Sequence, residues 1–266
     1  WSLDSLNPKI HVAGEYTNSV LMGKDYVLPT ETEFDAAIAH GKLDTIPVDT
    51  NQWPLCHNLV IYTPPGYATD SLSYPAAYFH DGDNQLGIAA VPNVLDNLIA
   101  AGKIQPTIAV FLEPNDRNLD YAFDRRMAFA DFVAQQLVPF VDQSFRTIDD
   151  PAQRATIGAS FGGLISAIIA YQHPDVFGNC GIHSGAFWPN DDWGVDFVRE
   201  RMDAPVKYAA IWGSYEGVGK NNQAIIDAFA AKDKEVLWRV LPEGHSWGLW
   251  KATTDDFLIH FFPVQP

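Results

Sequence analysis

The segment Thr156-Ile157-Gly158-Ala159-Ser160-Phe161-Gly162-Gly163-Leu164 holds a serine in a Gly-x-Ser-x-Gly pattern. Before it, Arg154 to Ile157 is typical of a short buried strand, and after it Leu164 to Tyr171 is typical of a buried helix. A serine on a sharp turn from strand to helix needs very small neighbours, because only these let the backbone pass. The segment therefore predicts that Ser160 is a nucleophile.

Apolar runs typical of strands alternate along the rest of the chain with runs typical of helices. Continuous apolar strands separated by amphipathic helices predict an α/β fold, in which helices cover both faces of a mainly parallel sheet. The expected strands are His57 to Thr63, Pro75 to His80, Thr107 to Glu113, Arg154 to Ser160, Asn179 to His183, Lys207 to Gly213 and Val236 to Leu241. The expected helices are Val94 to Ala101, Phe123 to Phe145, Leu164 to Gln172, Asn222 to Ala231 and Trp247 to Phe262.

The first fifty residues fit this alternation less well, with one helix predicted over Glu31 to Ala39. The sequence Thr63-Pro64-Pro65-Gly66-Tyr67 predicts a turn that closes the first pair of strands. A length of 266 residues with 47% hydrophobic content suits one compact catalytic domain. We therefore expect residues 1–266 to form a single domain, with residues 1–50 as an N-terminal extension.

The composition is strongly acidic, with 17 Lys and Arg against 33 Asp and Glu, a formal net charge of -16 and a pI close to 4.6. This balance argues against nucleic acid or an anionic membrane surface as a general partner. No run of eighteen apolar residues is present, so no transmembrane segment is expected. The chain starts at Trp1 without the regions of a signal peptide, yet a leader already removed would leave the same start. The compartment stays open.

The sequence indicates neither a metal nor another cofactor. Cys56 and Cys180 lie far apart, without C-x-x-C or zinc-type spacing, so buried free thiols are favoured over a disulfide, which remains the alternative. The segment His80-Asp81-Gly82 could suggest metal ligation, but it lacks separated partner ligands elsewhere in the sequence.

A nucleophilic serine needs a general base and an orienting carboxylate, which follow it in the order serine, acid, histidine at the carboxyl ends of later strands. Glu216 follows the expected strand Lys207 to Gly213, and His245 lies in a loop after the next strand. We predict Glu216 as the acid and His245 as the base. Asp227 and Asp233 are less favoured as the acid because they fall on a helical stretch.

An acyl-transfer mechanism also needs donors for the oxyanion. We predict the backbone N–H of Phe161, next to the nucleophile, and a second donor in Gly82 to Asn84, with Asp83 as the choice. Arg117 follows the expected strand Thr107 to Glu113, where it could contact a substrate carboxylate or phenolate, or instead pair with acidic residues. Trp188 and Trp247 suit an aromatic or sugar-linked acyl ester, although core packing is the default alternative.

Four segments of the chain resemble the esterase D-like branch of the α/β-hydrolases, notably enterochelin (siderophore) esterases and the feruloyl esterase modules of xylanases. The segments are Phe79-His80-Asp81-Gly82, Gly158 to Leu164, His173 to Gly178 with His183 to Trp188, and Gly244-His245-Ser246-Trp247. The resemblance implies an α/β-hydrolase fold and a triad of Ser160, Glu216 and His245. It implies a serine esterase that acts on a small-molecule ester through an acyl-enzyme, without a cofactor.

Two departures keep the substrate open. Enterochelin esterases usually carry an additional N-terminal domain, and they bind an anionic catecholate that suits a pI of 4.6 poorly. The alternatives are a feruloyl or acetyl-type carbohydrate esterase, or an acyltransferase that uses the same triad. A binding module without catalysis is disfavoured by the presence of serine, acid and histidine in the expected order.

Overall fold

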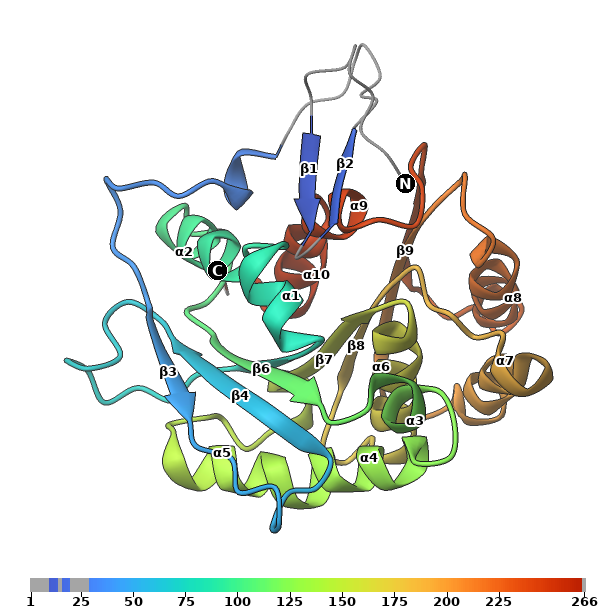
Figure 1. Cartoon of the computed structure of the whole chain (residues 1–266), viewed down its shortest axis with the longest axis horizontal. Helices are drawn as coiled ribbons and strands as arrows, with labels where there is room; N and C mark the ends of the chain where they lie inside the picture. The colour runs from blue at the N-terminus through green and yellow to red at the C-terminus, as the bar shows by residue number, and fades with distance from the viewer. Residues whose placement is uncertain (1–9, 14–15, 20–28, 265–266) are drawn as a thin grey trace.

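The computed structural model of the chain describes residues 10–13, 16–19 and 29–264, and an eight-stranded sheet forms its centre. The sheet contains β3 (Lys42–Ile46), β4 (Cys56–Thr63), β5 (Ala76–His80), β6 (Ile108–Pro114), β7 (Arg154–Ala159), β8 (Asn179–His183), β9 (Lys207–Gly213) and β10 (Leu237–Leu241). Their order across the sheet is β10-β9-β8-β7-β5-β6-β4-β3. In this sheet β4 alone runs opposite to the other strands, so the predicted mainly parallel sheet is confirmed (Figure 1).

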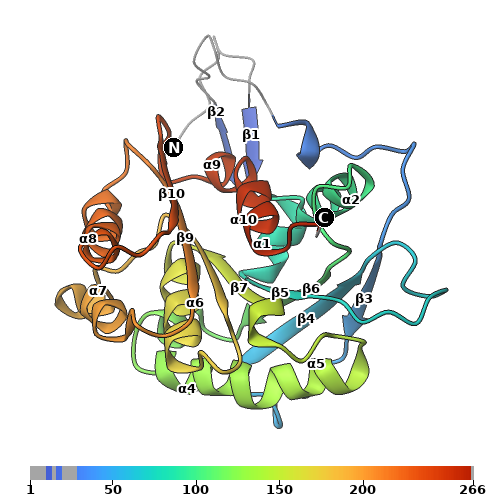
Figure 2. The same ribbon diagram turned by 180° about the vertical axis from the view of Figure 1, so that it is seen from behind.

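Helices cover both faces of the sheet, as Figures 1 and 2 show from opposite sides. One face carries α1 (Gly82–Gly87), α2 (Val91–Ala100), α9 (Trp247–Lys251) and α10 (Thr254–Phe261). The other carries α3 (Arg117–Tyr121), α4 (Arg126–Phe132), α5 (Val138–Ser144), α6 (Phe161–Gln172), α7 (Pro189–Arg201) and α8 (Gly219–Ala230). A short antiparallel hairpin of β1 (Ile10–Ala13) and β2 (Tyr16–Ser19) lies outside the large sheet.

The alternation of side chains along each strand divides the core into two layers. On β5, Ala76 and Tyr78 join the layer under α4 to α8, whereas Ala77 and Phe79 join the layer under α2, α9 and α10. Successive residues of a strand point to opposite faces, so a strand buried on both faces must be apolar throughout. Full burial of each large apolar side chain contributes roughly 1.5–3 kcal/mol, which explains why the apolar runs predict the strands well.

The predicted long helix from Phe123 to Phe145 is present as a nearly continuous helical segment that begins at Arg126. Between α4 and α5 it passes through a wider π-helical turn, η2 (Val133–Leu137). Pro139, the second residue after this turn, has no backbone N–H to donate to the carbonyl of Gln135, which accounts for the local widening.

The predicted helix from Glu31 to Ala39 is wrong. In this part of the chain the structure has one 3₁₀ turn, η1 (Thr30–Thr32), followed by bends and turns. The carbonyl oxygens of Glu31 and Glu33 accept hydrogen bonds from the side chain of Asn97, at 2.8 and 2.9 Å, rather than from a following helical turn. Contacts with α2 therefore replace the bonds that a helix would need.

The turn at residues 63–67 is present, but it does not close a pair of strands. It lies between β4 and β5, and β6 separates these two strands in the sheet. The strand that pairs with β4 is β3, with Lys42 opposite Thr63 and Ile46 opposite Leu59, and it was not predicted.

A second 3₁₀ turn, η3 (Pro151–Gln153), precedes β7. Among the described helices, none has the length and apolar content to span a membrane.

Candidate active site

The backbone at Ser160 is held in an uncommon conformation between β7 and α6. Its φ of 58° and ψ of -119° put a residue other than glycine in a strained region. A Cβ on Gly158 would lie 2.3 Å from the carbonyl oxygen of Gly162, so the turn can close only because position 158 is glycine. The N–H groups of the first turn of α6, which include those of Phe161 and Gly162, have no acceptor within the helix. The sharp turn expected from the sequence is present at Ser160.

Hydrogen bonds tie Ser160 to the loop after β8. The N–H of Ser160 donates to the carbonyl of His183 at 2.9 Å, and the N–H of Ala186 donates to the carbonyl of Ser160 at 3.0 Å. The N–H of Ser184 in turn donates to the carbonyl of Ile211 on β9, at 2.8 Å. The carboxyl ends of β7, β8 and β9 are therefore joined around the serine.

Glu216 and His245 are hydrogen-bonded to each other at this same edge of the sheet. His245 Nδ1 lies 2.5 Å from Glu216 Oε2. The other oxygen, Oε1, accepts hydrogen bonds from the hydroxyl of Ser184 at 2.7 Å and from the N–H of Gly213 at 2.5 Å. The Glu216 side chain is only 1% exposed, so three donors surround a buried carboxylate. A carboxylate held in this way fixes the orientation of the imidazole that it contacts.

The imidazole of His245 also packs against an aromatic ring. The ring of His245 meets that of Trp250 edge-on at 5.0 Å between centroids, and Trp247 meets Trp250 at 4.9 Å. The indole N–H of Trp250 donates to the hydroxyl of Ser184 at 2.8 Å, so this hydroxyl connects Trp250 with Glu216. Trp247 is thus placed as a packing partner of Trp250.

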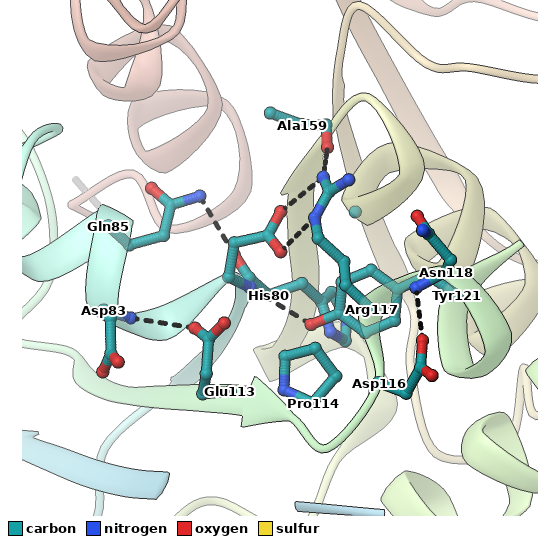
Figure 3. Close-up of polar contacts among 12 residues, drawn as sticks. His80, Asp83, Gln85, Glu113, Pro114, Asp116, Arg117, Asn118, Tyr121 and Ala159 are labelled. Carbon is teal, nitrogen blue, oxygen red and sulfur yellow. Dashed lines mark hydrogen bonds and ion pairs between the residues drawn. The ribbon is translucent and has the colours of Figure 1, made fainter. Parts of the chain in front are cut away.

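The two expected oxyanion donors differ in their surroundings. Phe161 occupies the first position of α6, directly after Ser160. The N–H of Asp83 donates to the carboxyl of Glu113 at 3.1 Å, as Figure 3 shows, while the Asp83 carboxylate accepts from the Asn58 amide at 2.6 Å. Burial, with smaller contributions from the charges of Asp81 and Asp83, raises the pKa of Glu113 to about 7.

Arg117 lies at this edge, but its guanidinium is held by protein groups. Nε and Nη2 donate to the two carboxylate oxygens of Asp81 at 2.6 and 2.8 Å, and Nη2 also donates to the carbonyl of Ala159 at 3.3 Å (Figure 3). Of the two interpretations left open by the sequence, pairing with an acidic residue is the one present. Trp188 is 53% exposed, and its ring lies 5.5 Å from that of Phe161.

Two residues at the site were not singled out for these contacts from the sequence. Asp81 is the buried partner of Arg117, and Ser184 is the hydroxyl that contacts Glu216. Each directly follows a parallel strand, which is the signal that could have found them. His80 instead points into the core, where its Nε2 lies 2.8 Å from the Thr156 hydroxyl and burial lowers its pKa to about 3. No cluster of three or more possible metal ligands occurs within residues 10–13, 16–19 and 29–264.

The fold is shared with solved esterase structures. The crystal structure of the enterochelin esterase from Shigella flexneri superposes with a TM-score of 0.79 at 20% sequence identity, covering 98% of this chain and 68% of that one. The chain therefore has the α/β-hydrolase fold, with a mostly parallel eight-stranded sheet flanked by helices.

Sequence comparisons assign the chain to a protein family. Residues 56–256 match the Esterase family model, described as "Putative esterase", and the chain belongs to this family. It is thus an ester hydrolase. The "Uncharacterized protein YbbA" of Bacillus subtilis (strain 168) is 27% identical over 194 residues, which cover 66% of this chain and 74% of that protein. The "Endo-1,4-beta-xylanase/feruloyl esterase" of Xylanibacter ruminicola is 28% identical over 208 residues, 71% of this chain but only 27% of that longer protein.

Proposed function

We propose that the chain is a serine carboxylic-ester hydrolase with Ser160 as nucleophile, His245 as general base and Glu216 as the acid of the triad. The observation that carries this proposal is the buried, fully hydrogen-bonded Glu216 carboxylate in contact with His245, on the sheet edge where the backbone turns sharply at Ser160. A serine, a histidine and a carboxylate in this order along an α/β-hydrolase chain suit acyl transfer.

In the proposed mechanism the imidazole of His245 takes the proton of the Ser160 hydroxyl as Oγ attacks the ester carbonyl. The tetrahedral intermediate collapses to an acyl-enzyme when the alcohol leaves with the proton from His245. Water then attacks the acyl-enzyme in the same way and releases the acid. Glu216 keeps the Nδ1 proton of His245 in place and stabilises the imidazolium.

The oxyanion donors in this proposal are the N–H groups of Phe161 and Asp83. Removal of one such donor typically lowers kcat by about 100- to 1000-fold in enzymes of this kind. The Asp83 N–H contacts Glu113 in the structure, and we propose that the oxyanion takes over this bond during the reaction.

We propose an ester with an aromatic group as the substrate class. The ring of Phe161, the residue after the proposed nucleophile, lies 5.5 Å from that of Trp188 and 6.1 Å from that of Phe123 between centroids, so aromatic rings cluster at the residue next to Ser160. The net charge of -16 favours a weakly charged ester over a strongly anionic catecholate complex. The feruloyl esterase relative is consistent with this choice.

The test is hydrolysis of p-nitrophenyl acetate, p-nitrophenyl butyrate, methyl ferulate and iron-free and iron-loaded enterobactin, together with labelling by a fluorophosphonate. We expect Ser160→Ala to lose hydrolysis and labelling, and methyl ferulate to be preferred over iron-loaded enterobactin. Ser144→Ala, an exposed serine at the end of α5, is the matched control and should retain full activity. Full activity of Ser160→Ala would refute the nucleophile, and preference for iron-loaded enterobactin would refute the substrate class.

A further inference from the structure

An ion pair on a buried carboxylate connects the two backbone segments that carry the proposed oxyanion donors. Asp81 precedes α1, which contains Asp83, and its side chain is 1% exposed. Arg117, from α3, binds both oxygens of this carboxylate through Nε and Nη2. Such a two-pronged contact fixes direction as well as distance, because the guanidinium is planar and rigid.

The same guanidinium reaches the other donor segment. Its Nη2 donates to the carbonyl of Ala159, the residue before Ser160, and its centre lies 5.6 Å from the centroid of the Phe161 ring. Figure 3 shows Arg117 extending from α3 towards Ala159. Arg117 therefore contacts residues on both sides of Ser160 while it binds Asp81.

Asp81 is itself constrained by its surroundings. Its backbone lies in the left-handed region, with φ of 59° and ψ of 51°, and its N–H donates to the hydroxyl of Tyr121 at 3.2 Å. Its carboxylate lies 3.0 Å from the position that a Cβ of Gly162 would occupy. The carboxylate thus packs directly against the first turn of α6, and residue 162 has to be small for this contact.

We propose that Arg117 and Asp81 are positioning residues that set the distance and orientation between the Phe161 and Asp83 N–H groups for the tetrahedral oxyanion. This inference rests on the proposed serine-esterase function, and it assigns the two residues no direct contact with the substrate. Donors that stabilise an oxyanion act only when both point at one atom, and a misplacement of about 1 Å can cost roughly 100-fold in rate. An ion pair that contacts both segments is suited to prevent such a displacement.

The experiment measures kcat and KM for p-nitrophenyl butyrate and the inhibition constant of phenylboronic acid, which forms a tetrahedral adduct with a reactive serine. In Arg117→Lys the charge remains but the two-pronged contact is lost. We expect kcat to fall roughly 30- to 100-fold, KM to stay within about twofold, and the inhibition constant to rise with the fall in kcat. A residue that bound the substrate in its ground state would instead raise KM.

Two further variants keep the test informative. The double variant Asp81→Asn/Arg117→Gln removes both charges, so it leaves no unpaired buried carboxylate that could prevent folding. We expect it to fold, as judged by circular dichroism, and to show the same loss of kcat and of boronate affinity. Arg125→Lys is the matched control, because Arg125 also pairs with a buried carboxylate, that of Asp120. The two arginine side chains are similarly exposed, 38% for Arg125 and 39% for Arg117. It should leave all three constants within about twofold.

The outcomes separate the two proposals. Wild-type kcat and boronate affinity in Arg117→Lys and in the folded double variant would overturn the positioning role while leaving the serine-esterase function intact. An increase in KM alone would also overturn it, in favour of substrate contact by Arg117. Failure of wild-type Ser160 to react with a fluorophosphonate would overturn the proposed function and this inference together.

Discussion

Strained backbone conformations recur where neighbouring strands end at the site. Asp81, Ser160 and Ser184 follow β5, β7 and β8, and their φ angles are 59°, 58° and 49°. Each such conformation costs a residue other than glycine on the order of 1–3 kcal/mol. All three residues make side-chain or backbone contacts around the proposed triad and oxyanion donors, so the surrounding hydrogen bonds stabilise conformations that would otherwise relax.

The hydroxyl of Ser184 should matter to the rate although it does not react. Ser184→Ala removes the donor to Glu216 Oε1 and the acceptor of the Trp250 indole N–H, so Glu216 and His245 lose part of their orientation. We expect kcat to fall about 10-fold with KM nearly unchanged, which corresponds to the roughly 1–3 kcal/mol of an unsatisfied buried group. Steady-state kinetics on p-nitrophenyl butyrate measure both constants.

The matched control for Ser184 is Thr107→Val, which deletes another fully buried hydroxyl that donates to the carbonyl of Gln105 at 2.8 Å. Thr107 precedes β6 at the opposite end of that strand from Glu113. Stability should fall in both variants and kcat only in Ser184→Ala. An equal fall in kcat in both would show that the effect is general rather than local.

Glu113 should make stability depend on pH. Its pKa is raised from 4.5 to about 7, chiefly by burial, so the folded state holds a proton that the unfolded state releases between these two pH values. The contribution is fully present below about pH 4.5 and is lost as pH rises through 7. A shift from 4.5 to about 7 corresponds to about 3 kcal/mol, and solvent screening reduces this value because the carboxyl is partly exposed. Relative to Glu113→Gln, the wild type should therefore lose roughly 2 kcal/mol between pH 4.5 and 8. Urea unfolding of both proteins at several pH values measures this difference, and parallel curves would contradict it.

At the scale of elements, the turn between β7 and α6 depends on a close approach of two glycines. In Gly158→Ala the new Cβ would lie 2.3 Å from the Gly162 carbonyl oxygen, so the turn must open. We expect a loss of about 2–3 kcal/mol in stability and a loss of kcat greater than 100-fold. Thermal unfolding and ester hydrolysis test the two effects.

The comparison variant is Gly87→Ala, because nothing lies within 4 Å of a Cβ at that residue, the last of α1. It should be neutral or stabilise the protein by up to about 1 kcal/mol, with activity retained. Tolerance of alanine at both positions would mean that the turn adapts without cost.

The strands of the parallel core and the edge strand β10 were predictable from the sequence, whereas β3 and α7 were not. Strand β5 is buried at every residue, so its apolar run could not be missed. Strand β3 is largely exposed, and α7 begins with Asn190, Asp191 and Asp192 in left-handed conformations that no helical pattern would predict. The helix expected over Glu31 to Ala39 was lost to contacts with Asn97, which are distant in sequence.

At the scale of the whole molecule, one of the two core layers, the layer under α4 to α8, buries both thiols. Cys56 and Cys180 are free and fully buried, which confirms the expected free thiols, and burial raises the pKa of Cys56 to about 11 and that of Cys180 further. A buried, protonated thiol reacts slowly with alkylating agents. Iodoacetamide at pH 7.5 should therefore label neither cysteine in the native protein and both on unfolding in urea, as measured by mass spectrometry. Rapid labelling of either one without urea would show local opening of its layer.

The sequence by itself determined the features that depend on neighbouring residues or on burial alone. The turn at Ser160 follows from two glycines in place, and the parallel sheet follows from strands that are apolar on both faces. The sequence also predicts that the serine, the acid and the base each follow a strand of this sheet, although their catalytic roles remain a proposal. The assignments of Phe161, Asp83, Trp188 and Trp247 likewise remain predictions.

Only the tertiary structure decided the contacts between distant segments. It inserted β6 between β4 and β5, paired Arg117 with Asp81 and joined Ser184 to Glu216. The physical reason is that an apolar run specifies that a segment is buried but not which strand lies beside it. Likewise, a charged or polar residue after a strand has many candidate partners of suitable chemistry in the sequence. Only the register of the sheet brings one of them within about 3 Å.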